Sequence, residues 1–443
     1  MRGVWRAGLL YLPVLGMLIT SSIAWSQTPC GENGDTDIAA VLSQHLERSA
    51  GLMATRGLPP PPEPDDITAF GNALSSYIAA DSALLIFSQT EDDYCALLWQ
   101  REAEPISTRI AGGRTLVDTA LLQFAEARNI TGAARQRTPR QRGAVAVDEP
   151  MALSSASAPD TLRQLSDILL PETIRDGLSG IRHLLIAPSG NIGTIPFSAL
   201  PLDTAGTVLA ERMSFAILPS LLEAAPGYLR IAQSYEIVQS DEAATPVPAL
   251  GPALVIGDPD GGGDPDWDFP PLPGARAEAH DIATLYGVKP LIGAQATLPA
   301  VVDRLRRSPR LIYLAAHGIA DPDEPLEGSF VKLSDGRLTA LAIQQMTLPS
   351  VPVFLSACQT GLGLNHEGGI IGLARAFDIA GAGPVMMSLW NIDDEATRAI
   401  MASAVRNLAR HPLPEALRLA VLEHRKTHPH EPEKWAAFSV FGR

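Results

Sequence analysis

Cysteine is scarce in this chain: only Cys30, Cys95 and Cys358 occur among 443 residues. Three cysteines are too few for the dense disulfide framework of a small secreted domain. Aromatic residues are also rare, at 5% of the sequence. Lys and Arg together number 34 against 49 Asp and Glu, a formal net charge of −15. Nucleic-acid binding requires a basic surface, so we expect no nucleic-acid partner.

Long apolar runs are missing everywhere except at the start of the chain. Residues 1–26, MRGVWRAGLLYLPVLGMLITSSIAWS, carry Arg2 and Arg6, then an apolar stretch, then a short Ala-Trp-Ser segment. This three-part pattern is typical of a secretory signal peptide that is cleaved after Ser26, and it predicts an exported protein, periplasmic or secreted. The alternative is an N-terminal membrane anchor, because the apolar stretch approaches spanning length. Once the signal is removed, we expect no integral membrane domain.

Export changes how the few cysteines are interpreted. In an oxidising compartment spare thiols tend to pair, and Cys30 and Cys95 both lie in the first hundred residues. These two are therefore candidates for a disulfide, which leaves Cys358 as an odd thiol to be considered as a reactive group. The alternative is that all three thiols are free and buried.

Repeats of fixed period and the common phosphate-binding and serine-hydrolase motifs are absent from the sequence. Beyond the signal peptide, residues 27–130 predict a helix followed by a β-hairpin around 83–99. Residues 131–158 are rich in Arg, Ala, Ser and Pro with little apolar periodicity, and they predict a flexible linker whose arginines are candidate sites of self-cleavage. Residues 159–443 form the remaining and largest unit.

Within that unit, short apolar runs alternate with segments of helical periodicity. The runs that end in polar or glycine-bearing turns are HLLIAPSG at 183–190, ALVIGDPDGGG from Ala253, LIYLAAHG at 311–318, VPVFLSACQTG at 351–361 and GPVMMSLWN at 383–391. This alternation predicts an α/β fold with a mostly parallel sheet flanked by helices. In such sheets, ligands bind beyond the carboxyl ends of the strands.

Two of these strand ends carry chemically reactive groups, His317 in AAHG and Cys358 in SACQTG. If the two strands are neighbours, the imidazole and the thiol emerge side by side. Acyl transfer by a thiol needs such a pair, because the imidazole favours the thiolate and later protonates the leaving amine. The backbone N–H groups of Gly318 and Cys358 are candidates for the oxyanion hole. The alternative is a structural role for the histidine, the more common role of a lone His at a strand end.

The segments around these two residues resemble the CHAT domain family, a group related to caspases, separases and gingipains. The resemblance is carried by LAAHG, LSACQTG, GGIIGLARAFDIAGAGPVMMSLWNIDDEAT and WAAFSVFG, and by HLLIAPSGNIGTIPFSALP and PPLPGARAEAHDIA upstream. It covers residues from about 160 to 443. It implies a caspase-like α/β sheet with a degenerate half at about 159–250 and a catalytic half at about 251–443. AAHG replaces the family's commoner ATHG, and the tetratricopeptide repeats frequent in the family are missing.

The resemblance implies that His317 acts as the general base and acid and that Cys358 is the nucleophile of a cysteine endopeptidase. Related peptidases often cleave after Arg or Lys with a carboxylate in the pocket, which makes Asp393 and Asp394 candidate pocket residues. The alternative for these two is to open the helix that follows, where acidic groups complement the helix dipole. The expected partner is a protein or peptide substrate, and the sequence leaves the oligomeric state open. The alternative function is a non-catalytic scaffold or protein-binding module with the same fold.

A cofactor is not expected, although calcium activates some caspase-like enzymes. The acidic segment GDPDGGGDPDWD, residues 257–268, offers five aspartates as oxygen ligands for calcium. Its spacing does not fit the EF-hand loop, and a turn-rich loop without a metal is the favoured interpretation.

Overall fold

The computed structural model of the chain describes residues 30, 36–46, 71, 74, 78–127, 157–218, 221, 252–262, 264, 266, 267, 269–321, 324, 326–356, 365, 366, 369, 370, 372–390, 392 and 394–442. The predicted signal peptide and residues 131–156 of the predicted linker lie outside the described residues. The helix expected near the start of residues 27–130 is present over the described residues 38–46.

Among the described residues, eleven strands form one large sheet in the order β3-β2-β1-β4-β5-β16-β15-β12-β8-β6-β7. Their bounds are β1 (Ser82–Gln89), β2 (Tyr94–Gln100), β3 (Ile106–Ile110), β4 (His183–Ala187), β5 (Ser214–Ile217), β6 (Leu254–Gly257), β7 (Leu291–Ile292), β8 (Ile312–Ala315), β12 (Val353–Ser356), β15 (Val385–Ser388) and β16 (Phe438–Phe441). Most neighbouring strands run parallel; the antiparallel neighbours are β1 with β2, β2 with β3 and β15 with β16. The predicted mostly parallel α/β sheet is confirmed.

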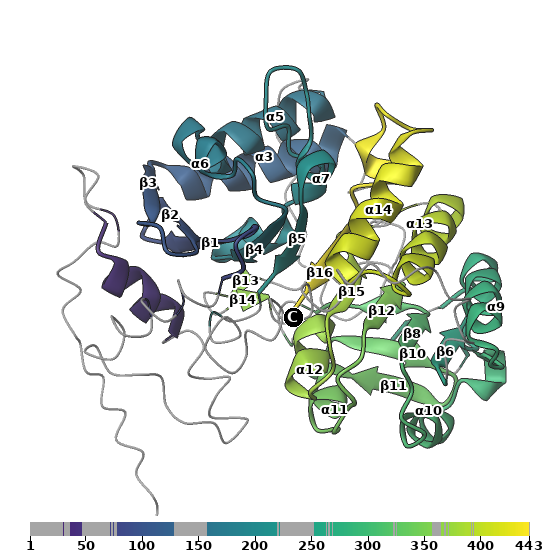
Figure 1. Ribbon diagram of the computed structural model, residues 1–443. Coiled ribbons are helices and arrows are strands. Elements are labelled where there is room, and N and C mark those ends of the chain that lie inside the picture. The colour runs from purple at the N-terminus through teal and green to yellow at the C-terminus, as the bar shows by residue number, and fades with distance from the viewer. Residues whose placement is uncertain are drawn as a thin grey trace, which may run out of the picture.

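Helices cover both faces of this sheet (Figure 1). Their bounds are α3 (Gly113–Ala127), α5 (Ala158–Leu169), α6 (Glu172–Gly177), α7 (Leu209–Arg212), α9 (Pro273–Tyr286), α10 (Leu298–Leu305), α11 (Ala340–Gln344), α12 (Leu373–Ile379), α13 (Asp394–Asn407) and α14 (Leu413–Arg425). In the C-terminal half, α9, α13 and α14 lie on one side of the sheet, and α10, α11 and α12 lie on the other (Figure 1). The helices α3, α5, α6 and α7 lie together over the N-terminal half.

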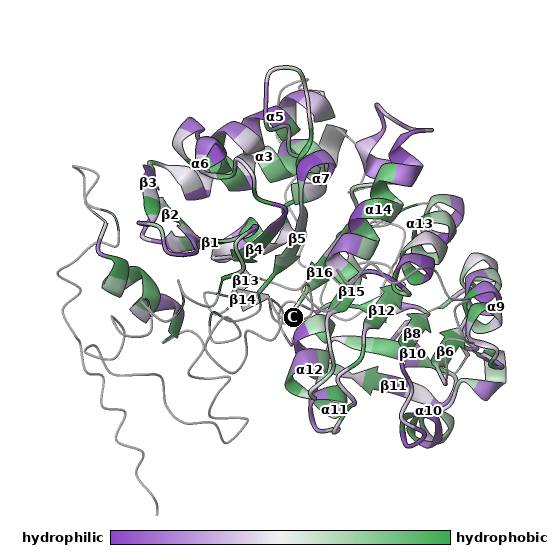
Figure 2. Ribbon diagram, in the orientation of Figure 1, coloured by the Kyte–Doolittle hydropathy of each residue, from purple (hydrophilic) through white to green (hydrophobic). Residues whose placement is uncertain are grey.

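The sequence accounts for this layered arrangement. The strands are short runs of Val, Ile, Leu, Phe and Met that are buried on both faces, as expected of parallel strands covered by helices. Figure 2 shows the strands as mostly hydrophobic, whereas the helices carry hydrophilic residues on their outer surfaces. Side-chain caps start three of the labelled helices: Ser157 accepts from the backbone of α5, Thr297 from that of α10 and Thr339 from that of α11.

The strand pairing sets up the region where the sequence predicted chemistry. β8 and β12 are parallel neighbours, with Ala315 directly opposite Ser356. β15 follows on the other side of β12, also parallel. The carboxyl ends of these three strands therefore meet at one edge of the sheet, as the alternating pattern predicted. His317 comes two residues after the end of β8.

A second, smaller sheet stands beside this edge. It contains β9 (Gly318–Ile319), β10 (Phe330–Leu333) and β11 (Gly336–Thr339), which pair antiparallel in the order β11-β10-β9. β9 begins directly after His317, and the backbone N–H of Lys332 donates to the carbonyl of His317 at 2.8 Å. The backbone around the histidine is thus held by a separate sheet. A short pair of strands, β13 (Asn365–His366) and β14 (Gly369–Ile370), completes the described strands.

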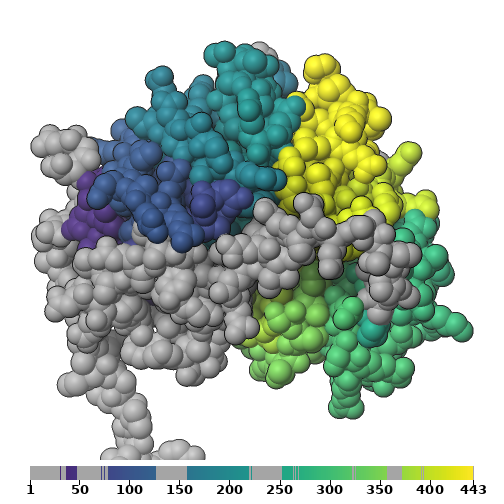
Figure 3. Space-filling model, viewed as in Figure 1, coloured from purple at the N-terminus to yellow at the C-terminus, as the bar shows by residue number. Residues whose placement is uncertain are grey.

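The two halves of the chain share one sheet and one hydrophobic core. β16 joins them, because it pairs parallel with β5 on one side and antiparallel with β15 on the other. Helix α14 crosses the same boundary: Arg418 donates to the carbonyl of Ala210 at 3.1 Å, and Arg425 pairs with Glu211 at 2.6 Å. In the space-filling view the yellow C-terminal segment packs directly against the teal N-terminal half (Figure 3).

The region before the linker is part of this sheet rather than a separate body. β1 pairs with β4 in parallel register, and β2 and β3 extend the sheet outward from β1. The predicted hairpin is β1 and β2, and β3 was not predicted. Cys30 and Cys95 form a disulfide, with Cα atoms 5.7 Å apart, which ties residue 30 to the start of β2. None of the described helices combines the length and the apolar character that crossing a membrane requires.

Candidate active site

His317 lies just beyond the carboxyl end of β8, whose sequence is IYLA. Ala316 separates the strand from the histidine, and the small sheet begins directly after His317. The histidine is only 5% exposed. The ring of Phe269 packs against its imidazole with centroids 5.1 Å apart. The imidazole is therefore enclosed rather than solvated, and its orientation is set by the protein around it.

A hydrogen bond to a backbone carbonyl determines which nitrogen of this imidazole carries the hydrogen. Nε2 of His317 lies 2.7 Å from the carbonyl oxygen of Pro270. A carbonyl oxygen only accepts, so Nε2 carries the hydrogen and donates it. In the neutral ring this leaves the lone pair on Nδ1, which is then the atom that takes a proton. Pro270 belongs to the loop that joins β6 to α9.

Cys358 lies outside the described residues. Its strand, β12, is described as far as Ser356, which lies opposite Ala315 of β8. The predicted neighbourhood of the two strands is therefore confirmed, whereas the position of the thiol stays a prediction. Gly318, the other residue expected in the oxyanion hole, lies in β9 opposite Val331.

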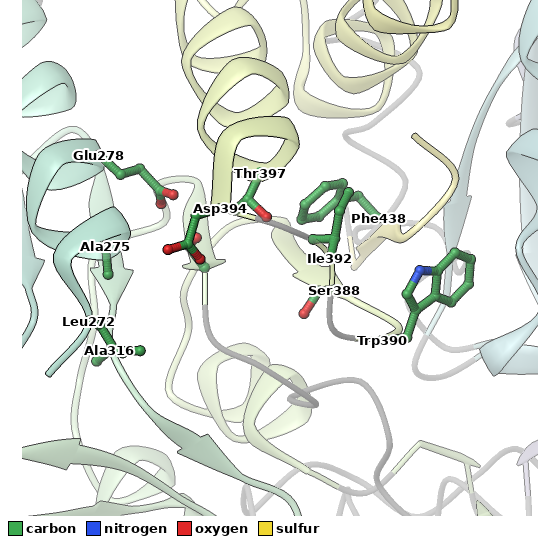
Figure 4. A pocket seen from close by; sticks show the side chains of 11 residues that line it. Leu272, Ala275, Glu278, Ala316, Ser388, Trp390, Ile392, Asp394, Thr397 and Phe438 are labelled. Atoms are coloured by element: carbon green, nitrogen blue, oxygen red, sulfur yellow. The ribbon is translucent and has the colours of Figure 1, made fainter. Parts of the chain in front are cut away.

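A pocket opens at the carboxyl ends of β8, β12 and β15, close to His317. It is lined by Leu272, Ala275, Glu278, Ala316, Ser356, Ser388, Trp390, Ile392, Asp394, Thr397 and Phe438. Its water-accessible volume is about 50 Å³, enough for a few water molecules or for the tip of a long side chain. Figure 4 shows the carboxylates of Glu278 and Asp394 on one side of the pocket and the rings of Trp390 and Phe438 on the other. The pocket thus has an acidic wall and an apolar wall.

Glu278 is the buried carboxylate of this pocket, only 3% exposed. The hydroxyl of Tyr313 on β8 donates to Glu278 Oε1 at 2.5 Å. Burial raises the pKa of Glu278 to about 7, although hydrogen bonds with Ser356 and Tyr313 oppose the shift. The negative charge of Asp394 raises the pKa further. Near neutral pH this side chain is therefore poised between its neutral and charged forms.

Asp394 is the first residue of α13 and lines the same pocket. It opens the helix, as one interpretation from the sequence expected, and its carboxylate also faces the pocket (Figure 4). Its role in substrate binding stays a prediction. Asp393 lies outside the described residues.

The acidic segment considered for calcium forms most of the loop between β6 and α9. Asp258 accepts from the backbone of Leu272 at 2.7 Å and from Arg276 at 2.8 Å. Asp264 and Asp266 both accept from Arg337. These aspartates are thus bonded to arginines and amides. Within the described part of the chain, no three or more His, Cys, Asp or Glu side chains gather as metal ligands.

Sequence reasoning missed two contributors to this site. The Pro270 carbonyl belongs to the backbone, which leaves no signature in the choice of side chains. Glu278 had a usable signal: it lies four residues before Ile282, on the buried face of α9. A charged residue on the apolar face of a helix requires a partner, and here the partner is Tyr313.

Comparison with known proteins gives a family match over most of the chain. The model of the CHAT domain matches residues 159–443. Tetratricopeptide repeat protein 28 of Homo sapiens is 26% identical over 341 residues, 65% of this chain and 13% of its own length. The Mus musculus protein of the same name is 24% identical over 307 residues, 59% of this chain and 12% of its own. The chain thus spans about an eighth of the length of these curated relatives.

The solved structures that match this chain include the following two, both at low sequence identity. The Saccharomyces cerevisiae separase–securin complex matches with a TM-score of 0.49 and 10% identity, over 91% of this chain and 34% of the solved chain. RgpB of Porphyromonas gingivalis, in a complex of its pro- and mature domains, matches with a TM-score of 0.37 and 14% identity, over 72% of this chain and 75% of the solved chain.

Proposed function

The chain belongs to the CHAT domain family, and from this premise we propose that it is a cysteine endopeptidase that cleaves peptide bonds with His317 and Cys358. The observation that carries the proposal is the bond between His317 Nε2 and the Pro270 carbonyl, at 2.7 Å. That bond leaves Nδ1 of the imidazole as the proton acceptor. The imidazole lies just beyond the carboxyl end of β8, the strand next to β12. Ligands bind at this carboxyl edge of a parallel sheet, and the position of the histidine there favours a catalytic role over a structural one.

Each residue then has a defined task in the proposed reaction. His317 Nδ1 takes the proton of the Cys358 thiol, and the thiolate attacks the peptide carbonyl carbon. The backbone N–H groups of Gly318 and Cys358 stabilise the developing oxyanion. His317 returns its proton to the leaving amine, and water, deprotonated by the same imidazole, releases the acyl group from the sulfur.

We propose that the substrate residue before the cleaved bond is basic. The pocket beside His317 combines an acidic wall of Glu278 and Asp394 with the apolar rings of Trp390 and Phe438. Arg and Lys have the matching character, an apolar stem that ends in a charged head. The chain's partner is accordingly a protein or peptide with an accessible basic residue.

Export of the protein is also part of the proposal. The Cys30–Cys95 disulfide supports it, because structural disulfides persist mainly in oxidising compartments. The periplasm or the extracellular space meets this condition, and an N-terminally anchored form exposed to the same compartment meets it as well.

Fluorogenic peptides that differ only in the residue before the cleaved bond test the proposed activity. We expect turnover with Arg or Lys at that position and none after Cys358→Ala or His317→Ala. Asp394→Asn should lower kcat/KM for the basic peptides by about 10- to 100-fold, because a hydrogen bond to a charged group is lost. Glu395→Gln is the matched control, since it removes a charge one residue further along α13 and lies outside the pocket lining.

The competing function is a non-catalytic scaffold that keeps the same fold. The curated relatives favour it, because their printed name refers to repeats rather than to an activity. No turnover of any peptide, with or without calcium, together with no labelling of Cys358 by a thiol-directed electrophile, would establish the scaffold. Turnover that persists in Cys358→Ala would exclude the proposed nucleophile.

A further inference from the structure

Arg337 lies on β11 in the small sheet, away from the strand ends that carry the proposed chemistry. Its Nε donates to Asp264 Oδ2 at 2.8 Å, and its Nη2 donates to Asp264 Oδ1 at 2.6 Å. The same Nη2 donates to Asp266 Oδ2 at 2.8 Å. The Asp264 side chain is only 2% exposed, whereas that of Arg337 is 26% exposed. Two parallel bonds to a buried carboxylate fix the orientation of a guanidinium as well as its position.

Asp264 is itself organised by the loop that it belongs to. Its Oδ1 accepts from the backbone N–H groups of Asp266 at 3.1 Å and Trp267 at 3.2 Å. The hydrogen bond from Arg337 lowers the pKa of Asp264, and the bonds to the backbone N–H groups act in the same direction. The carboxylate is therefore charged at neutral pH, and its bonds with Arg337 are charge-assisted.

A row of aromatic rings leads from this ion pair to the histidine. The Arg337 guanidinium lies over the ring of Phe330, 4.5 Å from its centroid. Phe330 meets Phe269 edge-on, with centroids 6.2 Å apart, and Phe269 packs on His317. Trp267 also stacks on Phe269, with centroids 6.4 Å apart. The part of the loop that carries Trp267 and Phe269 is thus packed between the Arg337–Asp264 ion pair and the imidazole of His317.

The base of the loop is held separately. Asp258, directly after β6, accepts from the N–H of Leu272 and from Arg276. Asp258 has a φ of 46°, in the left-handed region, which Asp tolerates better than most residues. Between this base and the Arg337 contact lies Pro270, whose carbonyl accepts from His317. The loop is therefore anchored at two points, on either side of the group that orients the histidine.

We propose that Arg337 is a positioning residue, which clamps the loop between β6 and α9 to the small sheet and so keeps the Pro270 carbonyl and the Phe269 ring against His317. The inference rests on the proposed function, because it concerns the imidazole of the same site. When the clamp is removed, the base and the packing of Phe269 still hold the loop, but its charged anchor on the small sheet is lost. The Nε2 bond then loosens, the imidazole orients less well toward the thiol, and less Cys358 thiolate forms.

The pH dependence of thiol alkylation tests this inference without a substrate. Cys30 and Cys95 are joined in a disulfide, so Cys358 is the one remaining cysteine of the three in the sequence. Its rate of reaction with iodoacetamide, measured from pH 5 to 9, follows the thiolate population. We expect His317→Ala to move the midpoint to higher pH. Arg337→Met should move it in the same direction and slow alkylation at pH 6.5 by about tenfold, less than the ~100-fold cost of a group misplaced by 1 Å because the base still holds the loop.

Peptide turnover gives a second readout that a purely structural role would not reproduce. Arg337→Met should lower kcat and move the acid limb of its pH profile, with KM changed little, because the pocket that binds the substrate side chain is left intact. Arg307→Met is the matched control: Arg307 follows the end of α10 and pairs with the exposed Asp303 of that helix at 2.6 Å. This variant should behave as the unchanged protein in both assays.

The possible results separate the two claims. If His317→Ala shifts the alkylation midpoint while Arg337→Met does not, the positioning role is wrong and the Cys–His pair stands. If His317→Ala leaves the midpoint unchanged, the pair is wrong and the positioning role fails with it. If Arg337→Met does not fold, two other variants test the inference. Arg337→Lys keeps the positive charge without the two parallel hydrogen bonds, and Asp264→Asn removes the negative charge of their acceptor. Both should shift the alkylation midpoint partly.

Discussion

Glu278 is a charged side chain among the buried positions of α9, and its protonation links the pocket to the stability of the fold. Its usual pKa of 4.5 rises to about 7, first because of burial. The groups that face it are the hydroxyls of Tyr313 on β8 and Ser356 on β12, together with the negative charges of Asp394 and Asp281. The folded state therefore holds a proton that the unfolded state releases at a lower pH.

From this we predict how stability depends on pH. Since the folded-state pKa lies above the unfolded value, the free energy of unfolding falls as pH rises from about 4.5 to about 7 and changes no further above that. The loss contributed by this group is about 3 kcal/mol. Glu278→Gln cannot ionise and keeps an oxygen for Tyr313, so it should lose this part of the pH dependence.

Denaturant unfolding at pH 5 and pH 8 measures the difference. The control is Glu172→Gln, which changes an exposed glutamate in the first turn of α6. A fall in stability between the two pH values that is equally large in Glu278→Gln and in the unchanged protein would contradict the assignment.

At the scale of elements, the contact between β6 and α9 supports both the pocket and the loop above it. Gly257, the last residue of β6, lets α9 approach closely: a Cβ there would lie 2.4 Å from Cβ of Ala279. It would also lie 2.8 Å from Cδ1 of Ile292. Real Cβ atoms do not approach other atoms so closely, so one extra methyl group must push the helix away from the strand.

Gly257→Ala should accordingly lower the free energy of unfolding by about 1–3 kcal/mol. It should also reduce peptide turnover, since α9 carries Glu278 and ends the loop that holds the Pro270 carbonyl. Gly262→Ala is a control from the same loop, because a Cβ at Gly262 meets no atom within 4 Å. Its stability should stay within about 0.5 kcal/mol of the unchanged protein. Equal stability of the two variants would contradict this account.

How far the sequence predicts these elements depends on how each one is stabilised. β8 and β12 were predictable because their apolar runs end in recognisable turns, and so was their parallel pairing. β10 and β11 were not, because FVKL and GRLT are short, and the second is largely polar. The small sheet depends on contacts such as that of Arg337 with Asp264. These residues lie far apart in the sequence, so no local pattern predicts that they meet.

The residues of the candidate site likewise differ in how far the sequence predicts them. His317 was found because a histidine at a strand end is visible in the sequence, and Asp394 because it follows the last predicted parallel strand. The group that orients His317 is a carbonyl from a loop 47 residues earlier in the chain. Its role depends on tertiary packing alone, and so does the contact between Glu278 and Tyr313.

At the scale of the whole molecule, the disulfide ties the start of the described chain to the outer part of the large sheet. Cys30 and Cys95 are 65 residues apart in the sequence, and Cys95 lies in β2, next to β1. A cross-link over a loop of this length stabilises a fold mainly by restricting the unfolded chain, typically by about 2–4 kcal/mol.

Reduction of the disulfide should therefore lower the free energy of unfolding by about that amount. Unfolding by denaturant with and without reductant measures the change, and Cys30→Ser combined with Cys95→Ser should reproduce the reduced value without reductant. A thiol titration in denaturant should count one thiol before reduction and three after it. Three thiols before reduction would show that the pair does not form.

The joining position of β16 has a consequence for how the protein is made. β5 ends at Ile217 and β15 ends at Ser388, but the strand that lies between them begins at Phe438. A ribosome therefore completes both halves of the sheet well before it supplies the strand that unites them. Until then each half presents an open edge that can pair with another polypeptide. The nascent chain is thus in particular need of chaperone protection in the interval between the synthesis of β15 and that of β16.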